Sequence, residues 1–261
     1  MKLNRSICIL LVILCLLTCI FTVPDYTCAE EKETIKVGYA ERNGYHTTDK
    51  RGNYQGYDYE YLTEIADYTD WEYEFVEGTW QECLERLKRG EIDILGGVSK
   101  TDEREDFALF SDSPSMYVSY CLMQKNGDKK YDYEDFDAFD GMTVGVIKSS
   151  SAAQELLRYS RENHFTCRIE YYDAEDSLID SLDKGEVDCI CLTDNRDLSH
   201  YSVMARFGYT QLYYAVAMNR PDLQAGLNNA MNHILAKNHY YEGFLSKKYY
   251  TSVENIALME K

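Results

Sequence analysis

Apolar and polar positions follow one another along the chain in blocks that predict strands and helices in turn. Apolar runs bounded by polar turns predict strands at 34–40, 72–76, 92–96, 117–124, 143–147, 168–172, 187–192 and 213–218. Apolar residues at helical spacing predict helices at 58–68, 80–89, 152–163 and 175–183, and two more after Pro221. Strands that alternate with helices indicate an α/β fold built on a parallel sheet.

One part of this pattern occurs twice. Residues 84–95 read LERLKRGEIDIL, and residues 179–190 read IDSLDKGEVDCI. Each copy predicts the end of an amphipathic helix, a glycine that terminates it, and an acidic residue before a buried strand. Because internal repeats usually reflect repeated structural units, we expect two lobes.

The polar segment 125–130 separates the two blocks of predicted elements. The predicted divisions are an export segment at 1–29, a first lobe at 34–126 plus 211–250, a second lobe at 127–210, and a C-terminal tail at 251–261. The chain then passes between the lobes twice, near 117–126 and 213–219. Two connecting strands would form a hinge beside a ligand cleft.

The N-terminus has the pattern of an export signal. After Lys2 and Arg5, residues 7–23 are almost all apolar and carry no charge, and small residues at 27–29 follow. This predicts a signal peptide cleaved after Ala29, although the apolar run is also long enough to remain as a membrane anchor. Lipid attachment is disfavoured because the cysteines here lack a small preceding residue. In either form the rest of the chain lies outside the cytoplasm and touches the membrane only through this segment.

Charge and cysteine content exclude several classes of function. The net charge is −18 at pH 7, which argues against nucleic acid and anionic membrane surfaces as partners. Five cysteines follow the export segment, an odd number without CxxC spacing, which argues against a disulfide framework or a zinc site. We expect them to be buried as small hydrophobic side chains, and no cofactor is implied.

Five motifs, in order and spacing, resemble the family 3 extracellular solute-binding proteins. They are Gly56-Tyr-Asp58, Trp80, Gly90-Glu-Ile-Asp93, Ser99-Lys-Thr-Asp-Glu-Arg104 and Phe110-Ser-Asp-Ser-Pro114. The resemblance implies a two-lobed periplasmic-binding-protein-like fold (type II) with a ligand cleft and a two-strand hinge. It also implies that the lobes close on a small polar solute, typically an amino acid, which is delivered to an ABC importer.

The same resemblance assigns a carboxylate-binding role to Arg104, with Gly97 and Ser99 supplying backbone N–H groups and a hydroxyl. A planar guanidinium suits this role because it makes paired, charge-assisted bonds to a carboxylate. The alternatives are a surface ion pair for Arg104, with an acidic neighbour, and a tight turn without a ligand at Gly97.

In the second lobe, Ser150 and Ser151 precede a helix whose free N–H groups would complete the carboxylate site, unless Ser151 simply caps the helix. Trp80 occupies the family's aromatic wall position, with core packing as the alternative. Asp194 is the nearest match to the carboxylate that meets the ligand ammonium group. Its distance from Asp188 is one residue longer than the common pattern.

The first loop departs from the family. It has Asn43-Gly-Tyr-His46 where a Pro-Phe pair often stands. Tyr45 is a candidate replacement for the aromatic contact, and we expect His46, alone in a polar loop, to be solvated.

Two other functional classes follow from the same residues. The segments 56–62 and 75–80 look like the sensor versions of this domain in Gram-positive membrane receptors, so the alternative function is ligand sensing with a membrane signalling partner instead of an ABC permease. A few relatives of the fold are dehydratases. However, the sequence shows no catalytic triad, metal cluster or nucleotide loop, so we expect no enzyme activity.

Overall fold

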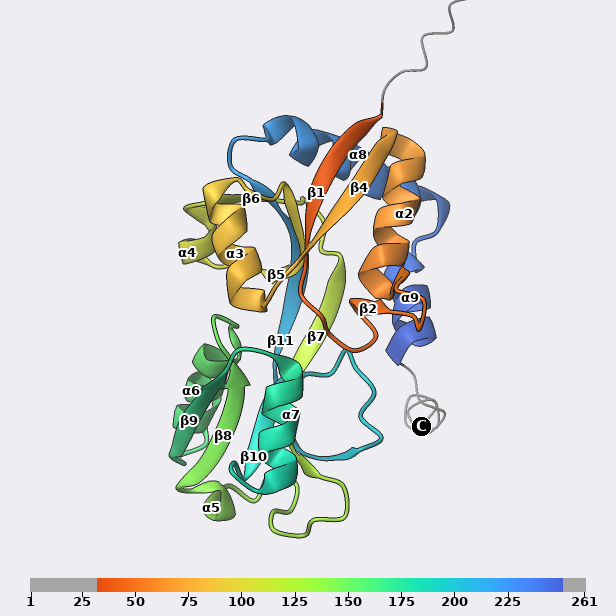
Figure 1. Ribbon diagram of the computed structural model, residues 1–261. Helices are drawn as coiled ribbons and strands as arrows, with labels where there is room; N and C mark the ends of the chain where they lie inside the picture. Colours follow the sequence, from red (N-terminus) through yellow and green to blue (C-terminus); the bar gives the residue numbers. More distant parts are fainter. Residues whose placement is uncertain (1–31, 251–261) are drawn as a thin grey trace, which may run out of the picture. The chain divides into compact units, whose positions relative to one another are not determined.

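The computed structural model describes residues 32–250 (Figure 1). Its strands are β1 Glu33–Tyr39, β2 Thr47–Thr48, β3 Tyr54–Gln55, β4 Trp71–Glu77, β5 Ile94–Ser99, β6 Ala108–Phe110, β7 Met116–Lys125, β8 Met142–Ile147, β9 Cys167–Tyr172, β10 Cys189–Thr193 and β11 Tyr201–Ala217. Its helices are α2 Tyr57–Thr69, α3 Trp80–Arg89, α4 Asp102–Glu105, α5 Phe136–Phe139, α6 Ala152–Glu162, α7 Glu175–Lys184, α8 Pro221–Lys237 and α9 Tyr241–Tyr250. The predicted export segment and C-terminal tail lie outside the described residues.

Two blocks of strands share one topology. In the first block the parallel strands lie in the order β4-β1-β5, and β11 joins β5 antiparallel. In the second block they lie in the order β9-β8-β10, and β7 joins β10 antiparallel. In both blocks the first strand along the chain is central, so the repeat predicted from the sequence is confirmed as a repeat of structure.

The repeated sequence folds the same way in both copies. Gly90 and Gly185 end α3 and α7 in the left-handed conformation, at φ 70°, ψ 24° and φ 71°, ψ 24°. Glycine adopts this conformation without the steric cost of a Cβ atom. The carboxylates of Asp93 and Asp188 then accept hydrogen bonds from backbone N–H groups of the adjacent strands, at 2.9 Å from β1 and 2.8 Å from β8. The repeated Gly-x-x-Asp therefore ends a helix and fastens the start of the next strand.

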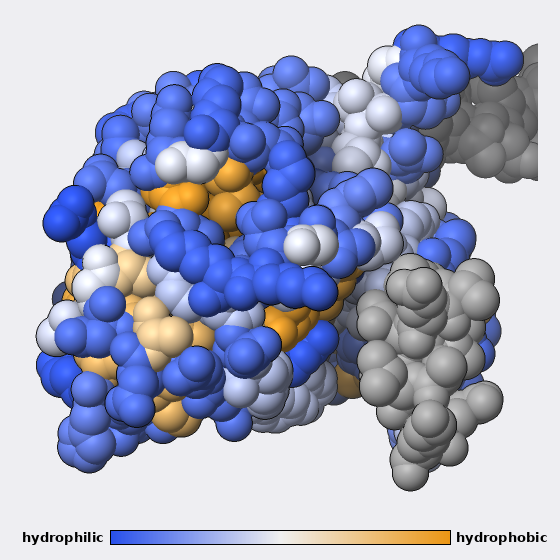
Figure 2. Space-filling model, turned by 90° about the horizontal axis from the view of Figure 1, so that it is seen from below, coloured by the Kyte–Doolittle hydropathy of each residue, from blue (hydrophilic) through white to orange (hydrophobic). Residues whose placement is uncertain are grey.

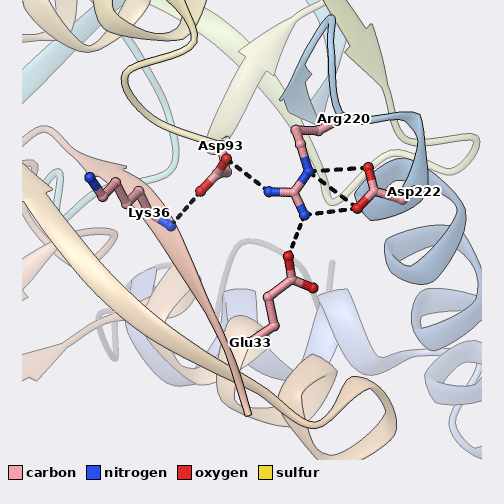
Figure 3. A network of polar contacts seen from close by, with 5 residues as sticks. All are labelled: Glu33, Lys36, Asp93, Arg220 and Asp222. Carbon is pink, nitrogen blue, oxygen red and sulfur yellow. Dashed lines mark hydrogen bonds and ion pairs between the residues drawn. The ribbon is translucent and has the colours of Figure 1, made fainter. Parts of the chain in front are cut away.

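In the first block this aspartate belongs to a larger ionic network (Figure 3). Arg220 lies 3.2 Å from Asp93, and it also pairs with Asp222 at 2.8 Å and with Glu33. The network joins the starts of β1 and α8 to the residue before β5. In the second block Lys130 pairs with the equivalent Asp188.

We expect Arg220→Gln to destabilise the protein by about 1–2 kcal/mol at pH 7, a modest loss because solvent screens a partly exposed network. The hydrogen bond from Arg220 lowers the pKa of Asp222 below its ordinary 3.8. This contribution is therefore present above pH 3.8 and is lost as the pH falls through the lowered pKa. Urea unfolding should show that Arg220→Gln lowers the free energy of unfolding less at about pH 2.5 than at pH 7. The exposed Arg161→Gln is the control for the loss of one positive charge. An equal loss at both pH values would contradict this account.

Helices cover both faces of each block (Figure 1). One core lies between the first block and α2, α8 and α9, and another lies under α3. In the second block α5 and α6 cover one face, and α7 covers the other. Consecutive residues such as Ile94 and Leu95 in β5 therefore enter opposite cores. Burial on both faces explains why these strands read as continuous apolar runs.

The two blocks are joined by β7 and β11, which pair antiparallel. Packing changes from the first block to the second between Val118 and Tyr120 in β7, and between Leu212 and Phe207 in β11. At this place β11 shifts register between Phe207 and Thr210, around Gly208 at φ 59°. In β7 this changeover lies before the boundary 126/127 expected from the sequence, whereas in β11 the expected boundary 210/211 lies within it.

The expected strand 213–218 is in fact the end of the much longer β11, which begins at Tyr201. The structure also shows two register shifts along this strand, between Val203 and Ala205 and between Phe207 and Thr210. A β-bulge adds a residue that breaks the period of two by which strands are recognised. This interruption hid the first half of β11 from the sequence pattern.

The cysteines and the surface agree with the composition. Cys83, Cys121, Cys189 and Cys191 are buried, Cys167 is partly buried, and all five are free thiols. Hydrophilic residues cover most of the face in Figure 2, as the high charge content predicts. Across residues 32–250, no helix combines the length and apolar character needed to cross a membrane.

Candidate ligand-binding site

A cavity of about 300 Å³ lies where the carboxyl ends of parallel strands from both blocks meet. Most of its lining residues lie at or just after the ends of β1, β4 and β5 in the first block, and of β8, β9 and β10 in the second. This is where open α/β sheets bind their ligands. The volume is at the lower end of the range for ligand pockets, which suits a small molecule.

Six of the seven residues predicted from the sequence line this cavity: Trp80, Gly97, Ser99, Arg104, Ser150 and Ser151. The structure does not bring Asp194 to them. Its carboxylate accepts a hydrogen bond from the Ser119 N–H at 2.9 Å and pairs with Arg206 at 2.9 Å, so it lies at the junction of β7 and β11. Thr193, one residue earlier, lines the cavity instead.

Arg104 is a buried cation held by neutral groups. It is 8% exposed, and its guanidinium donates to the carbonyls of Ser99 and Ser149, both at 2.9 Å. No carboxylate within residues 32–250 approaches it to ion-pair distance, and its acidic neighbour Glu105 pairs with Lys100. The expected alternative, a surface ion pair, is therefore wrong. Burial lowers the pKa of Arg104, although a guanidinium stays protonated in proteins, and three of its five N–H groups remain for an anion.

Ser149 supplies a contact that the sequence did not reveal. Its carbonyl accepts hydrogen bonds from Arg104 and from the Trp80 indole Nε1 at 3.3 Å. Ser149 lies at φ 58°, a conformation that costs a residue with a side chain on the order of 1 kcal/mol. This turn thus holds the carbonyl of the second block against two side chains of the first.

The hydroxyl of Ser151 also contacts the first block. Ser151 opens α6 without capping it, and its Oγ shares hydrogen bonds with Ser99 Oγ at 3.0 Å and with Tyr120 Oη at 2.6 Å. The simple capping role left open by the sequence is therefore excluded. Ser150 lines the cavity, but its hydroxyl donates to the Ile147 carbonyl at 2.7 Å.

The Trp80 side chain lies between a core and the cavity. It is the first residue of α3, which a reciprocal capping box fixes: Thr79 accepts from the Glu82 N–H at 3.2 Å, and Glu82 accepts from the Thr79 N–H at 2.8 Å. The indole packs against the core under α3 and also lines the cavity, with the Arg104 guanidinium 6.0 Å from its ring.

The first loop packs tightly against β5 and buries a polar cluster. Asp58 is fully buried, 2.7 Å from His46 Nε2, and it accepts a hydrogen bond from the Tyr45 hydroxyl at 3.1 Å. The expectation that His46 is solvated is wrong, since it is 2% exposed. A Cβ atom on Gly96 would lie 2.5 Å from Asp58, so this glycine serves the close approach of the loop.

Arg42 was missed by the sequence reasoning. It lines the cavity, and its guanidinium carbon lies 3.7 Å from the centre of the Tyr45 ring. Its Nε and Nη2 are buried and have no hydrogen-bond partner among the described residues. The available signal was its position three residues after the end of a parallel strand, where lining residues gather.

Two further charged residues line the cavity as a pair. Arg196 lies 2.5 Å from Glu175, and its Nε donates to the Thr193 carbonyl at 2.6 Å. Arg196 is buried, and 14% of the Glu175 side chain is exposed. Each charge is thereby neutralised by the other.

The family model for bacterial extracellular solute-binding proteins, family 3, matches residues 35–252. The chain belongs to this family. The resemblance drawn from the sequence motifs is thus confirmed. The description of the family also indicates a location outside the cytoplasm.

A probable histidine-binding protein of Neisseria gonorrhoeae is 23% identical to the chain over 163 residues. The match covers 62% of this chain and 59% of that protein, so the chain matches about three fifths of the curated relative's length.

Solved structures share the fold. An ancestral arginine-binding protein bound to arginine matches with a TM-score of 0.71 and 20% identity, over 84% of this chain and 99% of its own. The periplasmic domain of Bordetella pertussis BvgS matches with a TM-score of 0.72 and 19% identity, over 84% of this chain and 43% of its own. The predicted two-lobed, type II periplasmic-binding-protein fold is therefore confirmed.

The description of a third solved structure mentions an enzyme. An ancestral amino acid-binding protein, described as a precursor of cyclohexadienyl dehydratase, has a TM-score of 0.71 and 22% identity, over 84% of this chain and 96% of its own. The family consists of solute-binding proteins, and the two preceding structures are an arginine-binding protein and the periplasmic domain of BvgS.

Proposed function

We propose that this chain binds an amino acid or a similar small carboxylate in the cavity, outside the cytoplasm, and that Arg104 binds the carboxylate. The observation that carries the proposal is that Arg104 is a buried cation without a carboxylate partner in residues 32–250. An uncompensated buried charge is costly. An anionic ligand would compensate it with paired, charge-assisted hydrogen bonds.

Other groups in the cavity suit the same ligand. The Ser99 and Ser151 hydroxyls face each other at 3.0 Å between the blocks, and Ser151 opens the 11-residue helix α6. The free N–H groups at the start of a helix favour an anion. Trp80 offers a flat apolar surface for the rest of the ligand.

The contacts between the blocks support binding by closure. Trp80, Ser99 and Arg104 of the first block all bond to residues 149–151 of the second. We infer that the two blocks are lobes that move about the changeover in β7 and β11, where a register shift around Gly208 interrupts the regular pairing. A ligand that binds the closed form better would shift the population towards it.

For the partner, we propose an ABC importer to which the closed form delivers its solute. The amino-acid-binding neighbours support this role. A ligand-sensing role with a membrane signalling partner is the second candidate, and the likeness to the BvgS periplasmic domain supports it.

A thermal-shift screen of the purified chain against amino acids and simple carboxylic acids tests the binding function. At about 100 times its Kd, a true ligand should stabilise the folded state by about 2.7 kcal/mol. The decarboxylated amine of the best amino acid, or the amide of the best acid, should give no shift. Equal stabilisation by that analogue, or no shift with any carboxylate, would overturn the proposal.

A further inference from the structure

The charged residues of the cavity are unequally neutralised. Its arginines are Arg42, Arg104 and Arg196, and its carboxylates are Glu41, Asp173 and Glu175. Glu175 pairs with Arg196, whereas Asp173 pairs with Lys148 and 67% of its side chain is exposed. Glu41 is also exposed. Among the described residues, Arg42 and Arg104 therefore have no carboxylate within ion-pair distance.

These two guanidinium groups lie along the same strand. Arg104 donates to the Ser99 carbonyl at 2.9 Å. The Nη2 of Arg42 lies against Gly97, 2.9 Å from where a Cβ atom would stand. Gly97 and Ser99 are separated by one residue in β5, which sets their Cα atoms about 7 Å apart. One small molecule can therefore reach both cations.

The wall opposite offers little to a cationic group. Thr193 lines the cavity near the place where the sequence predicted a carboxylate, and its hydroxyl donates to Asn195 at 2.6 Å. Asp194 is held at the strand junction by Ser119 and Arg206. The nearby Glu175 is already neutralised by Arg196.

We propose that the ligand carries two carboxylates, as an acidic amino acid or a dicarboxylic acid does, and that Arg42 binds the second one. The inference rests on the proposed function, because it places the first carboxylate at Arg104. The Tyr45 ring beneath Arg42 fixes the guanidinium in place, so little side-chain freedom is lost on binding. The two unpaired cations disfavour cationic amino acids, unlike the arginine-bound neighbour.

Calorimetric titration of the full chain with L-glutamate, glutarate, L-glutamine and L-arginine tests the ligand class. We expect L-glutamate or glutarate to bind at least about tenfold more tightly than L-glutamine and L-arginine. The difference between L-glutamate and glutarate shows whether the ammonium group contributes. Equal or tighter binding of L-glutamine or L-arginine would overturn the inference, and so would the absence of binding by all four.

The variant Arg42→Gln tests whether Arg42 binds the second carboxylate. We expect it to weaken binding of the tighter dianion by about 100-fold and that of L-glutamine by less than about threefold, because only the dianion has a second carboxylate. Arg42→Lys should recover part of the loss. Arg51→Gln, an exposed change of equal charge in the same loop, is the control and should leave both affinities unchanged. A purely structural role for Arg42 would lower both affinities together and would contradict the inference.

The two proposals fail in different ways. If L-glutamine binds and depends on Arg104 but the dianions are not preferred, the proposed function stands and this inference falls. If the dianions are preferred and Arg42→Gln removes that preference alone, both stand.

Discussion

Replacement of Arg104 by glutamine is expected to weaken binding of a carboxylate ligand by about 100-fold or more. The guanidinium is the buried cation of the cavity whose bonds all run to neutral carbonyls, at Ser99 and Ser149. Glutamine keeps one donor group but loses the charge and the planar fork that match a carboxylate. Calorimetric titration with the best ligand from the screen measures the loss.

The fold should survive this change. Because Arg104 has no carboxylate partner in the described part of the chain, its removal leaves no buried anion behind. The melting temperature without ligand should therefore stay close to that of the original chain. Lys100→Gln is the matched control, since Lys100 is an exposed cation four residues away that pairs with Glu105, and it should bind the ligand normally. Affinity within about threefold of the original in Arg104→Gln would contradict the assignment, because a lost charge pair costs far more.

Replacement of Asp58 by alanine is expected to lower the free energy of unfolding by about 3–5 kcal/mol. Asp58 is 0% exposed, and it is bonded to His46 at 2.7 Å and to the Tyr45 hydroxyl at 3.1 Å. In the alanine variant, His46 and the Tyr45 hydroxyl would be buried without this hydrogen-bond partner, and a space would open beside Gly96. Urea unfolding at pH 7 measures the difference.

Two further variants test whether the loss of stability comes from the buried contacts of Asp58. Asp67→Ala changes an exposed aspartate of the same helix and should alter the stability by no more than about 0.5 kcal/mol. Asp58→Asn keeps the shape and one acceptor oxygen, so it should lose less than Asp58→Ala. Equal, small losses in all three variants would show that the cluster does not stabilise the first loop.

Local signals account for the part of the fold that the sequence predicted best. The helix expected at 80–89 is found as Trp80–Arg89, because the residues of its capping box, Thr79 and Glu82, and its terminal glycine, Gly90, lie in the helix or directly beside it. The first half of β11 was missed because its bulges are set by pairing with β7, a strand far away in the sequence.

The sequence predicted the cavity-lining residues best where they lie at or just after the end of a strand. Ser99 ends β5, and Arg104 follows in α4, so both reach the cavity as the motif implies. The side chain of Asp194 lies outside the cavity because neighbouring residues at the end of a strand point to opposite sides. The extra residue between Asp188 and Asp194 therefore turns the carboxylate away. Thr193 faces the cavity, and Asp194 faces Ser119 and Arg206.

The contacts made by loops could not be predicted from the sequence. His46 is buried because the first loop folds onto Asp58, and Arg42 is placed by its contact with Tyr45. The left-handed conformation of Ser149, which turns its carbonyl to Arg104, has no local signal in a serine-rich turn. The contacts of His46 and Ser149 join residues 12 and 45 positions apart in the sequence, and the contact of Arg42 with Tyr45 depends on how the first loop folds.

A crystal structure of the chain with its tightest carboxylate ligand would test the central claim most directly. The account predicts a ligand carboxylate oxygen at about 2.9 Å from a guanidinium nitrogen of Arg104, inside the cavity between the two blocks. A ligand bound elsewhere, or bound in the cavity while Arg104 contacts only the carbonyls of Ser99 and Ser149, would contradict it.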